Sequence, residues 1–205
     1  MMKNKFISFE GVDGVGKTTQ INLFLEKLEK LNFDYQLYRE PGGTSLSECI
    51  REILLNNNND ISSITETLLF LSARSDLVDK NIIPLVKKGK SFIVCDRFFD
   101  STLAYQSYGR GINMDLVKII TDEILQNYIP STTFLLDCDI NLSLSRLNSK
   151  DRMESSGLEF LNKVKEGFLE LALLDKNRYV IIDANNSISD IEEAIWEHFS
   201  KRYLK

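Results

Sequence analysis

The chain has 205 residues, of which 43% are hydrophobic and 27% charged, with a formal net charge of -5. We expect one domain over residues 1–205 with a real core, and no nucleic-acid binding, which requires a basic face. No apolar run of about 18 residues and no charged-then-apolar leader is present, so we expect a cytoplasmic protein that binds no membrane.

The cysteines and the single histidine give little functional signal. Cys49, Cys95 and Cys138 are scattered without the spacing of a metal or redox motif, and each has apolar neighbours. We therefore expect three buried thiols. His198 lies among acidic and apolar residues near the C-terminus, where an exposed helix position is favoured over catalysis.

Short apolar runs rich in isoleucine, valine and phenylalanine predict five buried strands. In chain order they cover residues 5–9, 35–38, 91–95, 132–136 and 179–182. Helical spacing follows the first run, over residues 21–31, and precedes the last, over residues 158–168; residues 56–59 are all asparagine and predict a solvated loop. This alternation predicts an α/β fold, a parallel sheet covered by helices on both faces, with ligands at the carboxyl ends of the strands.

The segment after the first predicted strand has the spacing of a phosphate-binding P-loop. Gly11 is followed by four residues and then by Gly16, Lys17 and Thr18. In such a loop, backbone N–H groups surround the phosphates, the lysine reaches the β- and γ-phosphates, and the hydroxyl ligates Mg²⁺. The predicted ATP-binding loop consists of Gly11, Val12, Asp13, Gly14, Val15, Gly16, Lys17, Thr18 and Thr19.

Three predicted strands end in aspartate, the residue type that orients a metal beside a P-loop. Asp96 is the favoured metal-site residue, because Arg97 follows it directly and places a guanidinium where a second phosphate would bind. For Asp137 and Asp183 we favour helix capping or a loop role.

The chain lacks the Asn-Lys-x-Asp guanine motif of GTPases, and it is smaller and less basic than most motors that act on nucleic acids. A P-loop, an Asp-Arg pair and a polar segment over residues 146–157 are typical of a kinase that acts on a small molecule. This segment carries Arg146, Lys150 and Arg152 and is predicted to be a short lid.

The motifs together resemble those of the thymidylate kinase family, which transfers the γ-phosphoryl group of ATP to dTMP in dTTP synthesis. The matching segments are "FEGVDGVGKTTQ" (9–20), "REPGGT" (39–44), "LLFLSARSDL" (68–77), "DRFFDSTLAYQSYGRG" (96–111) and "DRMESSGLEF" (151–160). The resemblance implies a P-loop kinase fold with a five-stranded parallel sheet, with Mg²⁺ as cofactor, held by Thr18 and Asp96. It also implies a homodimer packed through helices.

The resemblance assigns a dTMP site residue by residue. The base would stack on Phe70 and meet the side chains of Arg74, Ser101, Thr102 and Gln106. Tyr105 would press against the sugar, and Asp13 would meet the 3'-hydroxyl. The acceptor phosphate would be held by Arg97 and Arg51, beside a turn that is shaped by Glu40 and Pro41.

Members of the family place their catalytic arginine either in the P-loop, as in the eukaryotic type, or in the lid, as in the bacterial type. This chain has Gly14 at the P-loop position of the eukaryotic arginine, so it resembles the bacterial type. Arg152 is then the transition-state arginine, with Lys17 and Arg97 as the other catalytic residues, and Arg146 lies near the adenine, as do residues 183–193. Glu154 would assist the metal or hold the lid closed. Two alternatives stay open: a kinase for another nucleotide or nucleoside, and a nucleotide-dependent binding protein.

Overall fold

Five parallel strands form the central sheet of the structure, a computed structural model that describes residues 5–56, 58–146 and 157–204. The strands are β1 (Phe6–Glu10), β2 (Tyr35–Arg39), β3 (Phe92–Asp96), β4 (Thr132–Asp137) and β5 (Tyr179–Asp183). Their spatial order is β2-β3-β1-β4-β5, and every adjacent pair is parallel. The five predicted strands and the predicted fold class are confirmed.

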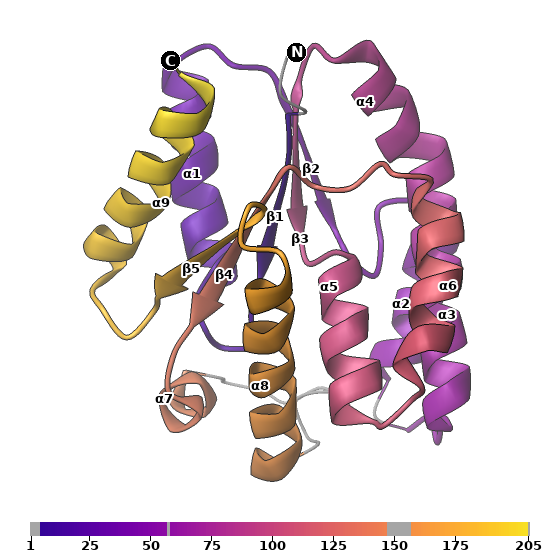
Figure 1. The fold of residues 1–205 in the computed structure, drawn as a ribbon. Coiled ribbons are helices and arrows are strands. Elements are labelled where there is room, and N and C mark those ends of the chain that lie inside the picture. The colour runs from indigo at the N-terminus through magenta and orange to yellow at the C-terminus, as the bar shows by residue number, and fades with distance from the viewer. Residues whose placement is uncertain (1–4, 57, 147–156, 205) are drawn as a thin grey trace.

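The strands point toward the lower edge of the sheet in Figure 1. There β1 lies between β3 and β4, with Phe9 opposite Asp96 and Glu10 opposite Leu135. Every residue of β1 is buried, whereas β2 and β5 at the sheet edges are partly exposed. The central strands are continuous apolar runs because helices cover both of their faces.

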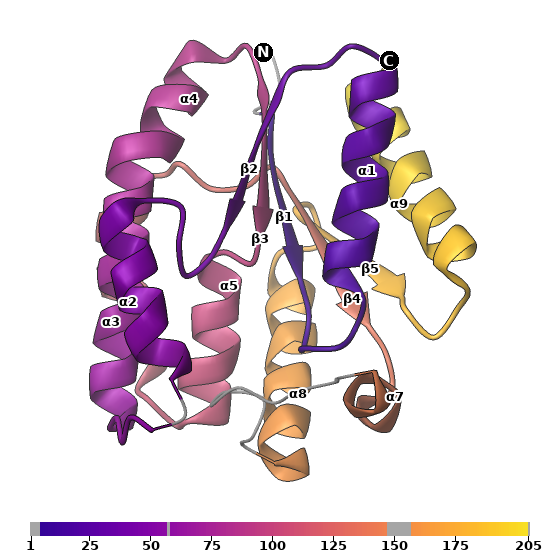
Figure 2. The same cartoon turned by 180° about the vertical axis from the view of Figure 1, so that it is seen from behind.

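Two helices cover one face of the sheet, α1 (Lys17–Lys30) and α9 (Ile188–Tyr203). The opposite face carries α8 (Leu158–Leu174) and α5 (Phe99–Thr102), which continues as a π-helical segment, Leu103–Gly109 (Figure 2). Outside these lie α2 (Ser45–Leu55), α3 (Ser63–Leu77), its π-helical continuation Val78–Ile82, α4 (Ile83–Lys88) and α6 (Met114–Leu125). The short α7 (Ile140–Ser145) follows β4.

Aromatic side chains fill the layer between the sheet and the α1/α9 face. The Phe24 ring lies 5.6 Å from that of Phe9 on β1 and 5.0 Å from that of Phe199 on α9. Such edge-to-face pairs add stabilisation beyond the buried area. They fix α1 against β1, the two elements that the P-loop connects.

On the other face, α8 approaches the π-helical segment closely because glycines stand at the contact. A Cβ on Gly109 would lie 2.6 Å from the Phe160 ring, and a Cβ on Gly167 would lie 2.5 Å from the Tyr108 ring. This close packing holds the segment that carries Tyr105 and Gln106.

One prediction about the cysteines is wrong. Cys95 and Cys138 are buried, but Cys49 is exposed. On α2 the buried positions are Ser47, Ile50 and Leu54, and helical periodicity turns Cys49 away from them. His198 is exposed on α9, as expected. Within the described part of the chain, no helix has the length and apolar character that crossing a membrane would require.

Candidate active site

The P-loop curls between β1 and α1 in a conformation that only glycines adopt without strain. Gly11, Gly14 and Gly16 have φ angles of 135°, 78° and 103°. A Cβ on Gly11 would lie 2.4 Å from the backbone oxygen of Leu136 on β4, so glycine is required sterically as well. The loop leads directly into the N-terminus of α1, whose N-cap is Gly16, and in a P-loop this helix end faces the phosphates.

Lys17 folds back over the loop from the first position of α1. Its Nζ donates hydrogen bonds to the backbone oxygens of Gly11, at 3.0 Å, and Val12, at 2.9 Å. Burial and the neighbouring Arg97 guanidinium lower the pKa of Lys17 to about 8. The ammonium is thus held by neutral carbonyls at the point where phosphates would arrive.

Arg97 begins the loop after β3 with a φ of 67°, a left-handed conformation that few non-glycine residues adopt. Its guanidinium donates to Gly11 O at 2.8 Å and Ser101 Oγ at 3.0 Å, and it forms an ion pair with Asp13. Tyr105 Oη donates to the other carboxylate oxygen of Asp13 at 2.9 Å. Burial alone would raise the pKa of Asp13, but Arg97 and Lys17 lower it to about 2.

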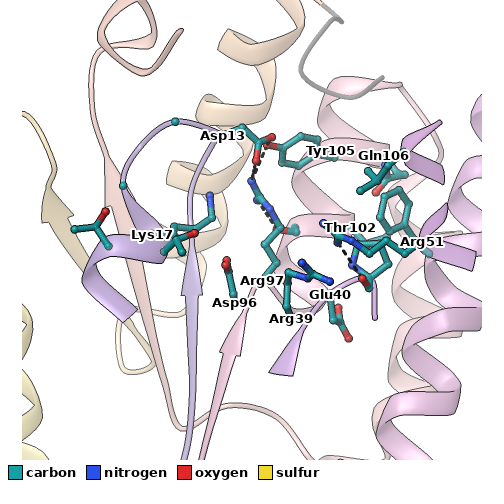
Figure 3. A pocket seen from close by; sticks show the side chains of 18 of the residues that line it. Asp13, Lys17, Arg39, Glu40, Arg51, Asp96, Arg97, Thr102, Tyr105 and Gln106 are labelled. Atoms are coloured by element: carbon teal, nitrogen blue, oxygen red, sulfur yellow. Dashed lines mark hydrogen bonds and ion pairs between the residues drawn. The ribbon is translucent and has the colours of Figure 1, made fainter. Parts of the chain in front are cut away.

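A cavity of about 530 Å³ opens at the carboxyl ends of β1 and β3. This volume suits a nucleotide-sized ligand. Figure 3 shows Lys17 toward one end of the cavity and Gln106 toward the other, with Asp13 and Arg97 between them. Its lining consists of Asp13, Gly14, Gly16, Lys17, Thr18, Thr19, Arg39, Glu40, Pro41, Arg51, Leu55, Phe70, Asp96, Arg97, Ser101, Thr102, Tyr105, Gln106 and Arg146.

Most of the residues predicted for the site therefore line one cavity. Arg51 reaches it from α2 and donates to Pro41 O at 3.0 Å, and Arg146 approaches the P-loop at Val15 O, 3.4 Å away. Gly11, Val12 and Val15 do not line the cavity but shape the loop behind it. Arg152 and Glu154 lie outside the described residues.

Arg74 is the one described base-site residue that does not line the cavity. Its Nε donates to Glu40 Oε2 at 2.9 Å, and both side chains are almost completely buried. Burial raises the pKa of Glu40, an effect that Arg74 partly offsets. Arg74 Nη1 is buried and has no hydrogen-bond partner among the described residues.

Asp137 and Asp183 have structural partners, in keeping with their predicted non-catalytic roles. Asp137 forms an ion pair of 3.0 Å with Lys165 on α8, and Asp183 accepts a hydrogen bond from the backbone N–H of Asn185.

A model of the family described as Thymidylate kinase matches residues 9–195 of this chain. The chain belongs to the thymidylate kinase family. A thymidylate kinase of Kosmotoga olearia is 41% identical over 197 residues, which cover 95% of this chain and 94% of that relative. A thymidylate kinase of Caldanaerobacter subterraneus subsp. tengcongensis is 41% identical over 206 residues, with 100% and 98% covered. The crystal structure of thymidylate kinase from Ehrlichia chaffeensis matches with a TM-score of 0.80 at 32% identity, covering 95% and 97% of the two chains.

Membership of the thymidylate kinase family defines the reaction as phosphorylation of dTMP to dTDP, with ATP as the phosphoryl donor. The predicted family and activity are confirmed. The alternatives, another nucleotide kinase or a binding protein without transfer, receive no support from these comparisons.

Sequence reasoning missed several residues that line or support the cavity. Arg39 and Leu55 line the cavity. Beneath it, Glu10 accepts hydrogen bonds from Phe98 N at 2.7 Å and Ser101 Oγ at 2.6 Å. Burial and the nearby charge of Asp100 raise the pKa of Glu10 to about 8. The sequence feature that could have indicated the role of Glu10 is its position as a charged residue at the end of the apolar strand β1.

Proposed function

We propose that the cavity binds dTMP between α2, α3 and the π-helical segment, with its phosphate directed toward Lys17 and Arg97, where ATP places its γ-phosphoryl group. The observation that carries this proposal is that one cavity joins the P-loop to Phe70, Thr102 and Gln106. The half-buried Phe70 offers a face for stacking, and Gln106 and Arg74 offer buried polar groups for the edge of the base.

Catalysis in this proposal consists of alignment and charge stabilisation. The phosphate of dTMP is already an anionic nucleophile, so the transfer needs no strong base. Lys17 and Arg97 approach the same backbone oxygen, that of Gly11, and therefore hold two positive charges on one side of the transferred group. His198 lies on α9, outside the cavity lining, which agrees with a mechanism without a histidine base.

Thr18 and Asp96 would hold Mg²⁺. Both line the cavity beside Lys17, and a hydroxyl with one carboxylate matches the hard oxygen donors that Mg²⁺ takes when phosphates supply further ligands. Within the described ranges no three His, Cys, Asp or Glu side chains come together in a way that could hold a metal ion, so phosphate oxygens would have to supply further ligands. The ion would neutralise charge on the phosphates of ATP.

The lid arrangement is the bacterial one in our proposal. Gly14 lines the cavity and carries no side chain that could approach the phosphates, so another element has to supply the transition-state arginine. Arg152 is our assignment, with Glu154 assisting the metal or closing the lid. Arg146 would border the ATP side, because its guanidinium approaches the P-loop.

Tyr105 and Asp13 would recognise the sugar. Their mutual hydrogen bond fixes the Tyr105 ring, which is 5% exposed, at the cavity wall. A ring held in this way leaves little room for a 2'-hydroxyl, while Asp13 can accept from the 3'-hydroxyl.

We also propose a cytoplasmic homodimer that forms through α3 and α6. These helices lie side by side and expose Ile64, Leu68, Leu116 and Ile119, of which Ile119 is 68% exposed. Large apolar side chains gathered on neighbouring helices are typical of an interface.

A coupled assay of ADP release tests the site. Wild-type protein with ATP and Mg²⁺ should release ADP rapidly with dTMP and much more slowly with dGMP, thymidine or no acceptor. Phe70→Ala should raise the KM for dTMP by about tenfold or more, because stacking is lost, and leave the KM for ATP unchanged. Leu173→Ala, at an exposed position on α8, is the control. An unchanged KM for dTMP in Phe70→Ala would refute the base placement.

A further inference from the structure

Gln106 lines the cavity from the π-helical segment and is 1% exposed. The two ends of an amide differ, because nitrogen only donates hydrogen bonds and oxygen only accepts them. Which end faces the ligand therefore decides whether the base must offer a donor or an acceptor.

A carboxylate outside the cavity lining holds the nitrogen end. Gln106 Nε2 donates to Glu66 Oε1 at 3.0 Å, and Glu66, in the first turn of α3, is itself 1% exposed. An ionised carboxylate only accepts, so a Gln106 amide turned the other way would set two acceptors against each other in a buried position.

Glu66 is held in turn by Arg110. The Arg110 Nε donates to the same Oε1 at 3.3 Å, and its guanidinium lies 4.3 Å from the centre of the Phe160 ring on α8. Two donors from different elements thus converge on one carboxylate oxygen. The arrangement fixes the Glu66 side chain and, through it, the Gln106 amide.

We propose that Glu66 is a positioning residue for base selection, which turns the Gln106 carbonyl oxygen toward the acceptor base. This inference rests on the proposed placement of the base beside Gln106. Thymine offers an N–H donor at N3, which Oε1 can accept, whereas cytosine has an acceptor there and would leave two buried acceptors unpaired. Uracil also has the N3 donor, so Glu66 selects against cytosine and not against uracil.

Glu66→Gln tests the proposal with almost no change in shape. Two facing amides can pair in either orientation, so Gln106 loses its fixed direction. We expect the ratio of dTMP to dCMP affinity, from KM for dTMP and competitive inhibition by dCMP, to fall at least about fivefold. The kcat with dTMP and the KM for ATP should stay near wild type. Glu159→Gln, the same change at an exposed position paired with Lys163, is the control and should leave the ratio unchanged.

The exchanged pair, Glu66→Gln with Gln106→Glu, is the second test. Its amide at position 66 would donate to the carboxylate at position 106, which again presents an acceptor to the base. Recovery of the dTMP/dCMP ratio in this double variant supports the proposal. The double variant also keeps the proposal testable if Glu66→Gln alone fails to fold.

Four results would overturn the proposal or its premise, and they are distinguishable. An unchanged ratio in folded Glu66→Gln, or equal losses for both nucleotides with a lowered Tm, would make Glu66 a purely structural residue. A folded double variant that does not recover the ratio would also contradict the proposal. An unchanged KM for dTMP in Gln106→Ala would instead remove the base from Gln106, and with it the proposed site.

Discussion

Burial of the ionisable Glu10 side chain has an effect on the free energy of unfolding that can be measured as a function of pH. Glu10 is the last residue of β1 and is completely buried, with one carboxylate oxygen facing Phe98 N–H and the other facing Ser101 O–H. Glu10→Gln keeps the shape and removes the ionisable group. An amide can still accept from Phe98 N–H and can donate to Ser101 Oγ, so no buried polar atom needs to lose its partner.

The sign of the effect follows from the raised pKa. In the folded protein the pKa of Glu10 is raised from 4.5 to about 8, so the native state holds this proton more tightly than the unfolded chain does. Between these two values unfolding releases the proton, and the free energy of unfolding falls as pH rises. A shift of this size corresponds to a loss on the order of 3–6 kcal/mol once the pH exceeds the folded pKa.

Urea unfolding of wild type and Glu10→Gln in parallel, from pH 5 to pH 9, measures this loss directly. At pH 5 both side chains are neutral in the folded state, and we expect similar stabilities. Above pH 8 the variant should be more stable by several kcal/mol, while the other titrations cancel in the difference. Glu159→Gln, at an exposed position, should show no such trend.

A stability difference that does not change with pH would refute the reasoning. So would a variant that becomes relatively less stable as pH rises. The first result would mean that Arg97 and the two hydrogen-bond donors fully offset the cost of burying ionised Glu10, and the second that they exceed it.

Three further predictions concern the same region. Arg97→Ala should lower kcat about 10³-fold while ATP binding, measured by calorimetry, persists; a collapse of ATP affinity would instead assign Arg97 to the donor site. Gly11→Ala should weaken ATP binding more than tenfold, because the new Cβ would lie 2.4 Å from a backbone oxygen of β4. Gly111→Ala is the matched control, since Gly111 has a φ of 75° but no atom within 4 Å of its Cβ. Equal ATP affinities of the two variants would contradict the steric argument. Arg178→Met should lower the free energy of unfolding, measured in urea, by about 3–5 kcal/mol, because it leaves Asp100 buried without its partner. Adding Asp100→Asn should restore much of this stability. If the double variant is as unstable as Arg178→Met, the unpaired charge of Asp100 is not the cause.

The sheet and the P-loop were predictable because their signals are local. β1, β3 and β4 are continuous apolar runs, as strands covered on both faces must be. The P-loop glycines stand where the chain needs positive φ angles, and the loop is complete within eight residues, Gly11 to Thr18. The same locality explains why Asp96 was the favoured aspartate, since Arg97 is its neighbour in sequence.

Contacts between distant segments were not predictable in this way. Glu66 and Gln106 are 40 residues apart, and Asp100 and Arg178 are 78 apart. In the sequence each is a polar residue of the kind usually found at the surface, and its burial follows only from the packing of α3, α5, the π-helical segment and the segment before β5. Cys49 is the converse case. Its apolar neighbours in the sequence suggested burial, but its position on α2 turns the side chain away from the buried face of the helix.

The paired charges around the cavity also determine how its residues should be tested. Each joins two elements that are distant in sequence, and the pairs are Asp13–Arg97, Glu40–Arg74, Glu66–Arg110 and Asp100–Arg178. Removing one partner leaves a buried charge, which destabilises the fold more strongly than the pair itself stabilises it. An alanine scan would therefore mix loss of function with loss of folding at Arg74 and Glu66. Isosteric changes and exchanged pairs reduce this mixing, because they keep the side-chain volume and most of the hydrogen bonds. If the site is built as proposed, such variants should change KM values and base selection while the Tm stays close to that of the wild type.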